Sequence, residues 1–106
     1  MNAWVILLLA GICETGWPLG FKLASVCPKY QIPLIIAAAA SMALSGVFLY
    51  MAQKTIPIST AYAVWTGIGG IGTFLIGVLA FGDAVNVMKC VSVFMIFAGL
   101  IGLKIF

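Results

Sequence analysis

Four long apolar segments, separated by short polar stretches, make up most of the chain. They cover about residues 3–21, 32–52, 57–81 and 88–105, and a helix needs roughly 20 mostly apolar residues to cross a bilayer. Open sheets cannot span lipid, and the segments lack the alternating pattern of barrel strands. The pattern therefore predicts an all-α membrane protein with four transmembrane helices. Because the connections are too short for a second unit, we expect residues 1–106 to form one domain.

The composition agrees with this prediction and argues against other classes of protein. Of the 106 residues, 65% are hydrophobic and 7% are charged, whereas roughly a quarter are charged in soluble domains. The five lysines are dispersed, so they do not form the clustered basic face of a nucleic-acid-binding protein. Histidine is absent and the three cysteines lack the spacing of paired ligands, so we expect neither a metal nor another cofactor. An enzyme is not expected either, because the single intramembrane carboxylate and scattered hydroxyls supply no nucleophile–base pair.

The lysines give the predicted spans almost no preferred orientation. Four spans place Lys54 and Lys104 on one side of the membrane and Lys22, Lys29 and Lys89 on the other. Orientation follows the side that carries more basic loop residues, and two against three is nearly balanced. We therefore hypothesise that the chain inserts both ways up, which would permit an antiparallel dimer.

Glu14 is the residue on which the functional interpretation depends. It lies within the first apolar segment, where a carboxylate costs about 2.5–3.5 kcal/mol or more to insert, so such residues are usually functional. Burial penalises the charged form, and the group can hold either a proton or a cation. Competition of both for one anion is the minimum requirement for coupled exchange. The alternative is a buried protonated carboxyl that bonds to a neighbour, although no span supplies a basic partner.

The residues around Glu14 are suited to a binding site. Ala10 and Gly11 share its helical face and allow another helix to approach, while Trp17 offers an indole N–H and an aromatic face. Pro18 cannot donate the hydrogen bond that would end on the Glu14 carbonyl. The first helix is therefore expected either to loosen functionally at this point or simply to tolerate a kink.

The third segment contains an aromatic pair and a run of glycines. Tyr62 and Trp65 are three residues apart, so they share a helical face and either pack in the core or against lipid, or form the wall of a cation site. Gly67 and Gly69 belong to a stretch that weakens the helix, since each glycine costs about 1 kcal/mol relative to alanine. We expect this stretch to act as a hinge.

Hydroxyl and small residues in the second and fourth segments have two interpretations each. Ser45 either bonds back to its own helix or orients Glu14 or a substrate. Ser92 and Gly99 lie on one face of the fourth segment, where small residues favour helix association, either within the chain or across a dimer seam. Asp83 follows Gly82 in a connection and is expected to be solvated.

The chain resembles the small multidrug resistance family along its whole length. The resemblance rests on the four spans, on Glu14 in the first of them, and on the block of residues 54–69, KTIPISTAYAVWTGIG. Several features are similar to the guanidinium-exporter subtype, including Trp17, Ser45, the triplet at 65–67 and the closing residues 99–104, GLIGLK. The segment TGWP at 15–18 departs from that subtype, which leaves the size of the substrate open.

The resemblance implies a mechanism and an assembly. It implies an antiparallel homodimer, or a pair with a homologous subunit, in the bacterial plasma (inner) membrane, which exchanges cytoplasmic cations for external protons. Carried over by position, Glu14 binds proton or guanidinium, and the residues that frame it are Trp17, Ser45, Tyr62 and Trp65. The alternative within the family is a polyspecific exporter of quaternary ammonium cations.

Overall fold

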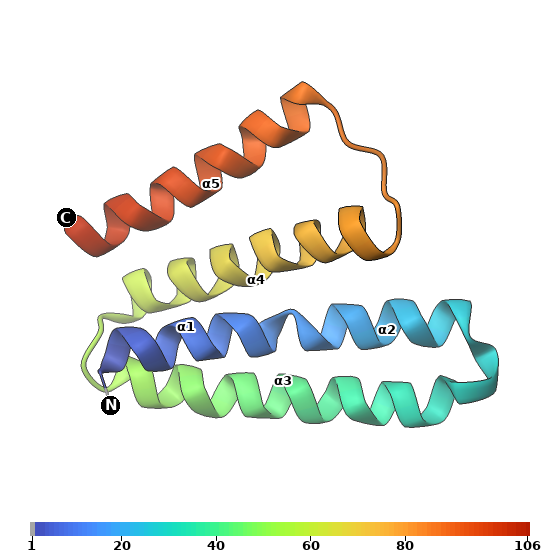
Figure 1. The fold of residues 1–106 in the computed structure, drawn as a ribbon. Coiled ribbons are helices and arrows are strands. Elements are labelled where there is room, and N and C mark those ends of the chain that lie inside the picture. The colour runs from blue at the N-terminus through green and yellow to red at the C-terminus, as the bar shows by residue number, and fades with distance from the viewer. Residues whose placement is uncertain (1) are drawn as a thin grey trace.

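The computed structural model describes residues 2–106, and the described residues form an all-helical protein (Figure 1). The helices in chain order are α1 (Ala3–Glu14), α2 (Gly16–Val26), the short 3₁₀ helix η1 (Pro28–Tyr30), α3 (Gln31–Gln53), α4 (Ile58–Ala80) and α5 (Val87–Ile105). Four stretches are long and apolar enough to cross a membrane: Ala3–Val26, Pro28–Gln53, Ile58–Ala80 and Val87–Ile105. The four predicted spans are therefore confirmed.

The first span is longer than expected. We predicted that it would end near residue 21, before Lys22, but α2 continues to Val26. Lys22 is exposed on this helix, and a lysine there can lay its aliphatic stem along the apolar surface while its ammonium group reaches polar surroundings. A lysine alone therefore does not terminate a transmembrane helix.

The helices α1 to α4 form a closely packed bundle, whereas α5 is set apart. The buried core consists of mostly small or medium side chains from α1, α3, α4 and the connection before α4: Leu7, Ala52, Ile56, Ala61 and Val64. The backbone of α5 lies close only to α4 among the described elements, and α5 contains no buried residue. Figure 1 shows α5 diverging from α4 towards the loop that joins them. One long face of α5 is thus left without protein contacts inside the chain.

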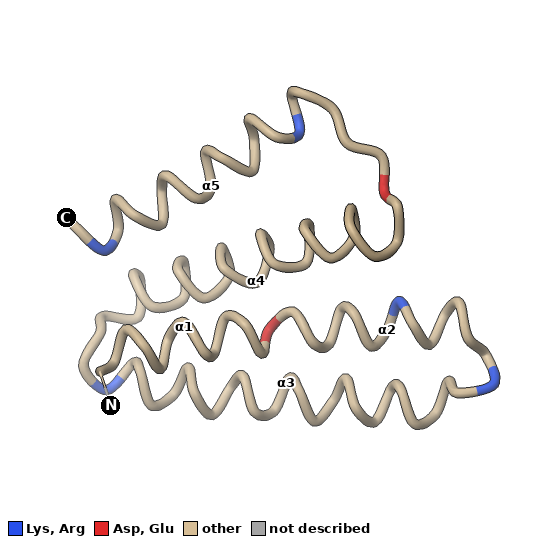
Figure 2. The backbone as a smooth tube through the Cα atoms, in the orientation of Figure 1, with Lys and Arg blue, Asp and Glu red and all other residues tan. Residues whose placement is uncertain are grey.

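Most of the charged residues lie at or near the two ends of the bundle, and two lie within the first span (Figure 2). Lys54 and Lys104 lie at the end that holds the N-terminus, and Asp83 and Lys89 lie in or near the connection at the opposite end. Lys22 lies four residues before the end of the first span, whereas Glu14 lies midway along it. The carboxylate that the sequence singled out is thus at membrane depth.

The first span is interrupted immediately after Glu14. The helix α1 ends at Glu14 and α2 begins at Gly16, with Thr15 between them. The Thr15 N–H donates to the carbonyl of Ile12, three residues earlier, at 3.1 Å, which makes a tighter turn than that of a regular α-helix. Pro18 has no N–H to donate to the Glu14 carbonyl, so the helical ladder loses a bond at this point. The break predicted from Pro18 is confirmed in position, and its functional role stays a prediction.

Candidate functional site

Glu14 lies in an open cleft of about 470 Å³ between the first span and α4. Trp17 and Pro18 line one side, and Thr66, Gly69, Gly70 and Thr73 of α4 line the other. The carboxylate atom Oε2 of Glu14 is buried and has no hydrogen-bond partner among the described residues. Buried polar atoms are nearly always paired, so the unpaired Oε2 sets Glu14 apart from most other side chains that line the cleft. The alternative of a carboxyl bonded at this oxygen to a neighbouring side chain is not what the structure contains.

Two glycines allow α4 to approach the Glu14 face of α1. A Cβ atom at Gly69 would overlap Cγ of Glu14, and one at Gly11 would lie 2.5 Å from Cγ2 of Ile68. Real Cβ atoms do not approach other atoms this closely, so a larger residue at either position would push the two helices apart. The expectation that Gly11 permits a close helix contact is confirmed. The close contact fixes the distance between Glu14 and α4.

Trp17 also lines the cleft and carries a second unpaired polar atom. Its indole Nε1 is buried and donates to no acceptor within residues 2–106, so it does not bind the Glu14 carboxylate in this structure. Its ring packs edge-on against Phe21, with 5.7 Å between ring centroids and 76° between planes. Glu14 and Trp17 thus both line the cleft, and each carries one buried polar atom that has no partner among the described residues.

Ser45 joins three helices by hydrogen bonds. It is completely buried, its hydroxyl donates to the Ala10 carbonyl at 2.6 Å, and it accepts a hydrogen bond from Trp65 Nε1 at 2.8 Å. The alternative that Ser45 bonds back to its own helix is therefore wrong, since α1 lies close enough to provide a better-placed acceptor. Ser41, one turn earlier, donates in the same way to the Cys13 carbonyl at 2.7 Å. These bonds hold the helix that carries Glu14 against α3.

The aromatic pair of α4 connects this group of hydrogen bonds to the surface of the bundle. The rings of Tyr62 and Trp65 lie 5.5 Å apart at a tilt of 49°, and Tyr62 is 55% exposed. Neither these two residues nor Ser45 lines the cleft that contains Glu14. The five predicted site residues thus form two groups, Glu14 with Trp17 and Ser45 with Tyr62 and Trp65. Ala10, one helical turn before Glu14, joins the two groups.

Two threonines of the cleft were not predicted as site residues. Thr66 and Thr73 both line it together with Gly69 and Gly70, and Thr66 donates its hydroxyl hydrogen to the Tyr62 carbonyl of its own helix. Their spacing of seven residues places them on one face of α4. The spacing of seven residues could have identified both threonines from the sequence, because it places them on the same helix face as the glycines that line the cleft.

The glycines predicted as a hinge lie in an uninterrupted helix. α4 is continuous from Ile58 to Ala80, a Cβ at Gly67 would lie 2.6 Å from Cδ2 of Leu100, and Gly69 faces Glu14. Both glycines therefore allow close contacts in this structure. Their role as a hinge stays a prediction.

The small residues predicted as a dimer seam on α5 are both exposed. Ser92 donates its hydroxyl to the Met88 carbonyl of the same helix at 2.8 Å. A Cβ built at Gly99 would meet no atom within 4 Å, so packing within the chain does not explain this glycine. The dimer seam at Ser92 and Gly99 stays a prediction.

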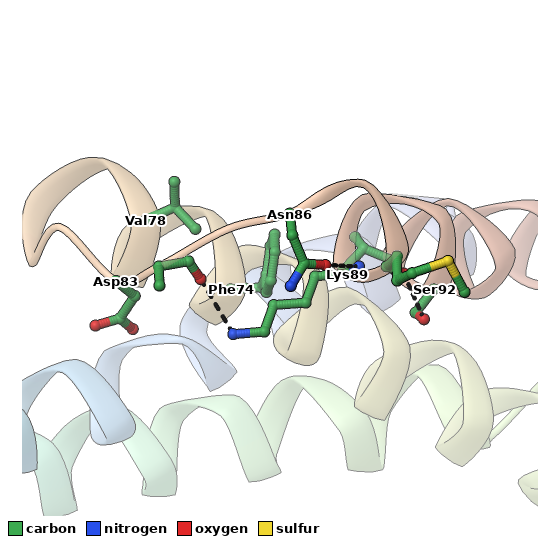
Figure 3. Close-up of a pocket in the computed structure, with 9 residues that line it drawn as sticks. Phe74, Val78, Asp83, Asn86, Lys89 and Ser92 are labelled. Carbon is green, nitrogen blue, oxygen red and sulfur yellow. Dashed lines mark hydrogen bonds between the residues drawn. The ribbon is translucent and has the colours of Figure 1, made fainter.

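Asp83 lies at the far end of the Glu14 cleft and also lines a cavity of about 520 Å³ between α4 and α5 (Figure 3). Gly82, with φ of +66°, turns the chain here, and the Asp83 N–H donates to the Gly77 carbonyl at 3.0 Å. Nζ of Lys89 donates to the Ala84 carbonyl at 3.1 Å. Asp83 is exposed, which agrees with the expected solvated position.

Replacing Ser45 with alanine is expected to reduce the free energy of unfolding by about 1–2 kcal/mol, because it leaves the indole N–H of Trp65 unpaired and removes the hydrogen bond that ties α3 to the Ala10 carbonyl. Unfolding by sodium dodecyl sulfate in mixed micelles, followed by circular dichroism, measures the change. Ser92→Ala is the matched control, since Ser92 is exposed and bonds to its own helix, and a change below about 0.5 kcal/mol is expected. Equal losses in both variants would contradict the structural role of Ser45.

Comparisons with known proteins agree on one family. The model of the family described as Small Multidrug Resistance protein matches residues 2–96. Curated relatives named Guanidinium exporter include one from Proteus vulgaris, 40% identical over 97% of both chains, and one from Yersinia pestis, 42% identical over the same shares. A further relative of that name, from Salmonella typhimurium, is 41% identical over 97% of this chain and 96% of its own.

Proposed function

Because the chain belongs to the small multidrug resistance family, we propose that it exports guanidinium or a small guanidinyl cation in exchange for protons. That the chain is a multi-pass membrane protein of a transport family follows from its four apolar spans and its family. Export of a small cation is supported by the shared name of relatives about 40% identical to it. No catalytic chemistry is needed for this function.

The observation that carries the proposal is Glu14 itself, which lines the cleft and whose buried Oε2 has no hydrogen-bond partner among the described residues. A buried carboxylate at membrane depth is stabilised either by a proton or by a cation, and one oxygen cannot satisfy both at full strength. Binding of the cation therefore expels the proton, and binding of the proton expels the cation. Alternate exposure of this one site to the two sides of the membrane would convert a proton gradient into cation export.

The preference for guanidinium rests on the mixed polarity of the cleft. A planar guanidinium group presents several N–H donors that match a carboxylate in two parallel hydrogen bonds. Glu14 supplies the carboxylate, Trp17 supplies an aromatic ring, and Thr66 and Thr73 are polar residues of the opposite wall. We include Ser45, Tyr62 and Trp65 in the proposal as residues that frame the site when it closes.

The proposed assembly is an antiparallel pair of chains in the inner membrane. The cleft of one chain is open, and a Cβ built at Gly99 of α5 would meet no atom of the described chain within 4 Å. A second copy, or a homologous subunit, would cover α5 at Ser92 and Gly99 and close the cleft. Such a pair would bring two copies of Glu14 to one central site.

Substrate-driven proton flux in liposomes tests the proposed function. Purified protein is reconstituted, a pH-sensitive dye is enclosed, and guanidinium or tetraethylammonium is added outside. We expect guanidinium to drive proton movement in the opposite direction, with a much smaller response to tetraethylammonium. Cation flux without proton movement would instead indicate a passive channel, and no flux of any kind would refute transport.

Export of quaternary ammonium cations is the second candidate, and one observation favours it. The cleft of about 470 Å³ is larger than a guanidinium ion requires, and the break of the first span at Thr15 lies beside it. A loosened helix could admit bulkier cations that bind through aromatic faces. A response to tetraethylammonium with none to guanidinium would support this candidate over the first.

A further inference from the structure

We propose that the groove between α1, α4 and α5 binds one acyl chain of an anionic glycerophospholipid, whose phosphate lies beside Lys104. The groove has a volume of about 310 Å³ and is distinct from the cleft of Glu14. Its walls are apolar, with Leu8 from α1, Val64 from α4 and Leu100 from α5 among them. In a chain that spans the bilayer, the medium that meets such a groove is hydrocarbon, so an acyl chain is its natural occupant.

The charge at one end of the groove selects the headgroup. Lys104 is in the last turn of α5, and its Nζ lies 5.2 Å from the centre of the Trp4 ring, which is in the first turn of α1. Both residues line the groove. Tryptophan and lysine are typical of the membrane–water interface, where phosphates lie. A lysine in this position attracts an anionic headgroup while the groove holds the attached chain.

The groove is separate from the face predicted for dimerisation. Phe97, Leu100 and Ile101 line the groove on the side of α5 that faces α1 and α4. Gly99, on another side of the helix, meets no atom of the described chain within 4 Å. A partner chain seated at Gly99 would therefore leave the groove available to lipid.

Lys54 provides a matched comparison for Lys104. It lies at the same end of the bundle (Figure 2), and its Nζ is 5.1 Å from the centre of the Tyr50 ring. Lys54 therefore has the same charge and a similar aromatic neighbour, but neither Lys54 nor Tyr50 lines the groove. An effect of Lys104 that Lys54 does not share requires the groove and not merely a positive charge at the membrane surface.

Quenching of Trp4 fluorescence by brominated lipid tests the proposal. In a Trp17→Phe/Trp65→Phe background only Trp4 emits, and bromine on an acyl chain quenches a tryptophan that it touches. The protein is reconstituted into phosphatidylcholine vesicles that contain a fixed fraction of brominated phosphatidylglycerol or of brominated phosphatidylcholine. We expect an apparent affinity about five-fold higher for phosphatidylglycerol, the preference expected from one lysine near anionic lipid.

The variants decide whether the groove causes this preference. Lys104→Gln should abolish the preference, and Lys54→Gln should retain it. Leu8→Phe should fill the groove and reduce quenching, whereas Val5→Phe on the same helix should not, since Val5 and Leu8 are similarly exposed (46% and 48%) but only Leu8 lines the groove. Equal quenching by both lipids, equal losses in both lysine variants, or no effect of Leu8→Phe would each overturn the proposal. Quenching by neither lipid would indicate protein in the groove and would overturn it too.

Discussion

Glu14→Gln is expected to reduce guanidinium-driven proton flux to the level of protein-free liposomes. Glutamine has nearly the same shape as glutamic acid, so the contact of this side chain with Gly69 is preserved. Glutamine cannot release a proton, however, and it carries no negative charge to bind the cation. The proposed exchange requires both of these properties. The loss should therefore appear without a loss of folding, which circular dichroism and gel filtration would verify.

The control for this variant is Asp83→Asn. Asp83 is the only other acidic residue in the chain, and it lies at the exposed end of the same cleft. Because it is outside the spans, we expect its replacement to leave most of the flux intact. Proton-coupled transport by Glu14→Gln, or an equal loss in Asp83→Asn, would contradict the assignment of Glu14 as the exchange site.

A direct measurement of coupling needs no membrane gradient. Addition of guanidinium to the wild-type protein in weakly buffered detergent should lower the pH, because the cation displaces a proton from Glu14. Glu14→Gln should show no such release. This measurement separates a failure of proton exchange from a failure of reconstitution.

The spans and the position of the carboxylate could be predicted because they depend on local properties. The length of an apolar run determines whether a helix can cross lipid, and the spans found at Ala3–Val26 and Ile58–Ala80 contain or nearly match the predicted ones. The missing N–H of Pro18 likewise acts within one helical turn, and the first span is interrupted there. The end of that span was misjudged because the reach of the Lys22 side chain exceeds one helical turn.

The partners of the site residues could not be predicted, because they depend on how the helices are rotated against one another. Ser45 meets the carbonyl of Ala10, 35 positions earlier, only because α3 presents that face to α1. The rotation of α4 likewise places Thr73 in the cleft and leaves Tyr62 at the surface. A pattern of seven residues identifies a helix face, but it does not tell which neighbour that face meets.

Gly69→Ala is expected to reduce guanidinium transport at least ten-fold while the protein remains folded. The added methyl group would overlap Cγ of Glu14 and would lie 3.0 Å from its Cβ. Rotation of the Glu14 side chain about its Cα–Cβ bond can relieve the first contact, but only a shift of α1 away from α4 can relieve the second. Either adjustment displaces the carboxylate from its position in the cleft, and overpacking of this kind costs about 1–3 kcal/mol.

Gly70→Ala separates this steric effect from the general effect of alanine in a helix. Both substitutions gain helix propensity of about 1 kcal/mol, and both positions line the cleft. A Cβ at Gly70 meets no atom within 4 Å, so this variant should transport within about two-fold of wild type and unfold at a similar or higher detergent concentration. If both variants lost activity equally, the flexibility of the glycine stretch would explain the loss, and the hinge predicted from Gly67 and Gly69 would be favoured. Loss in Gly69→Ala alone would show that the distance between α4 and Glu14 limits exchange.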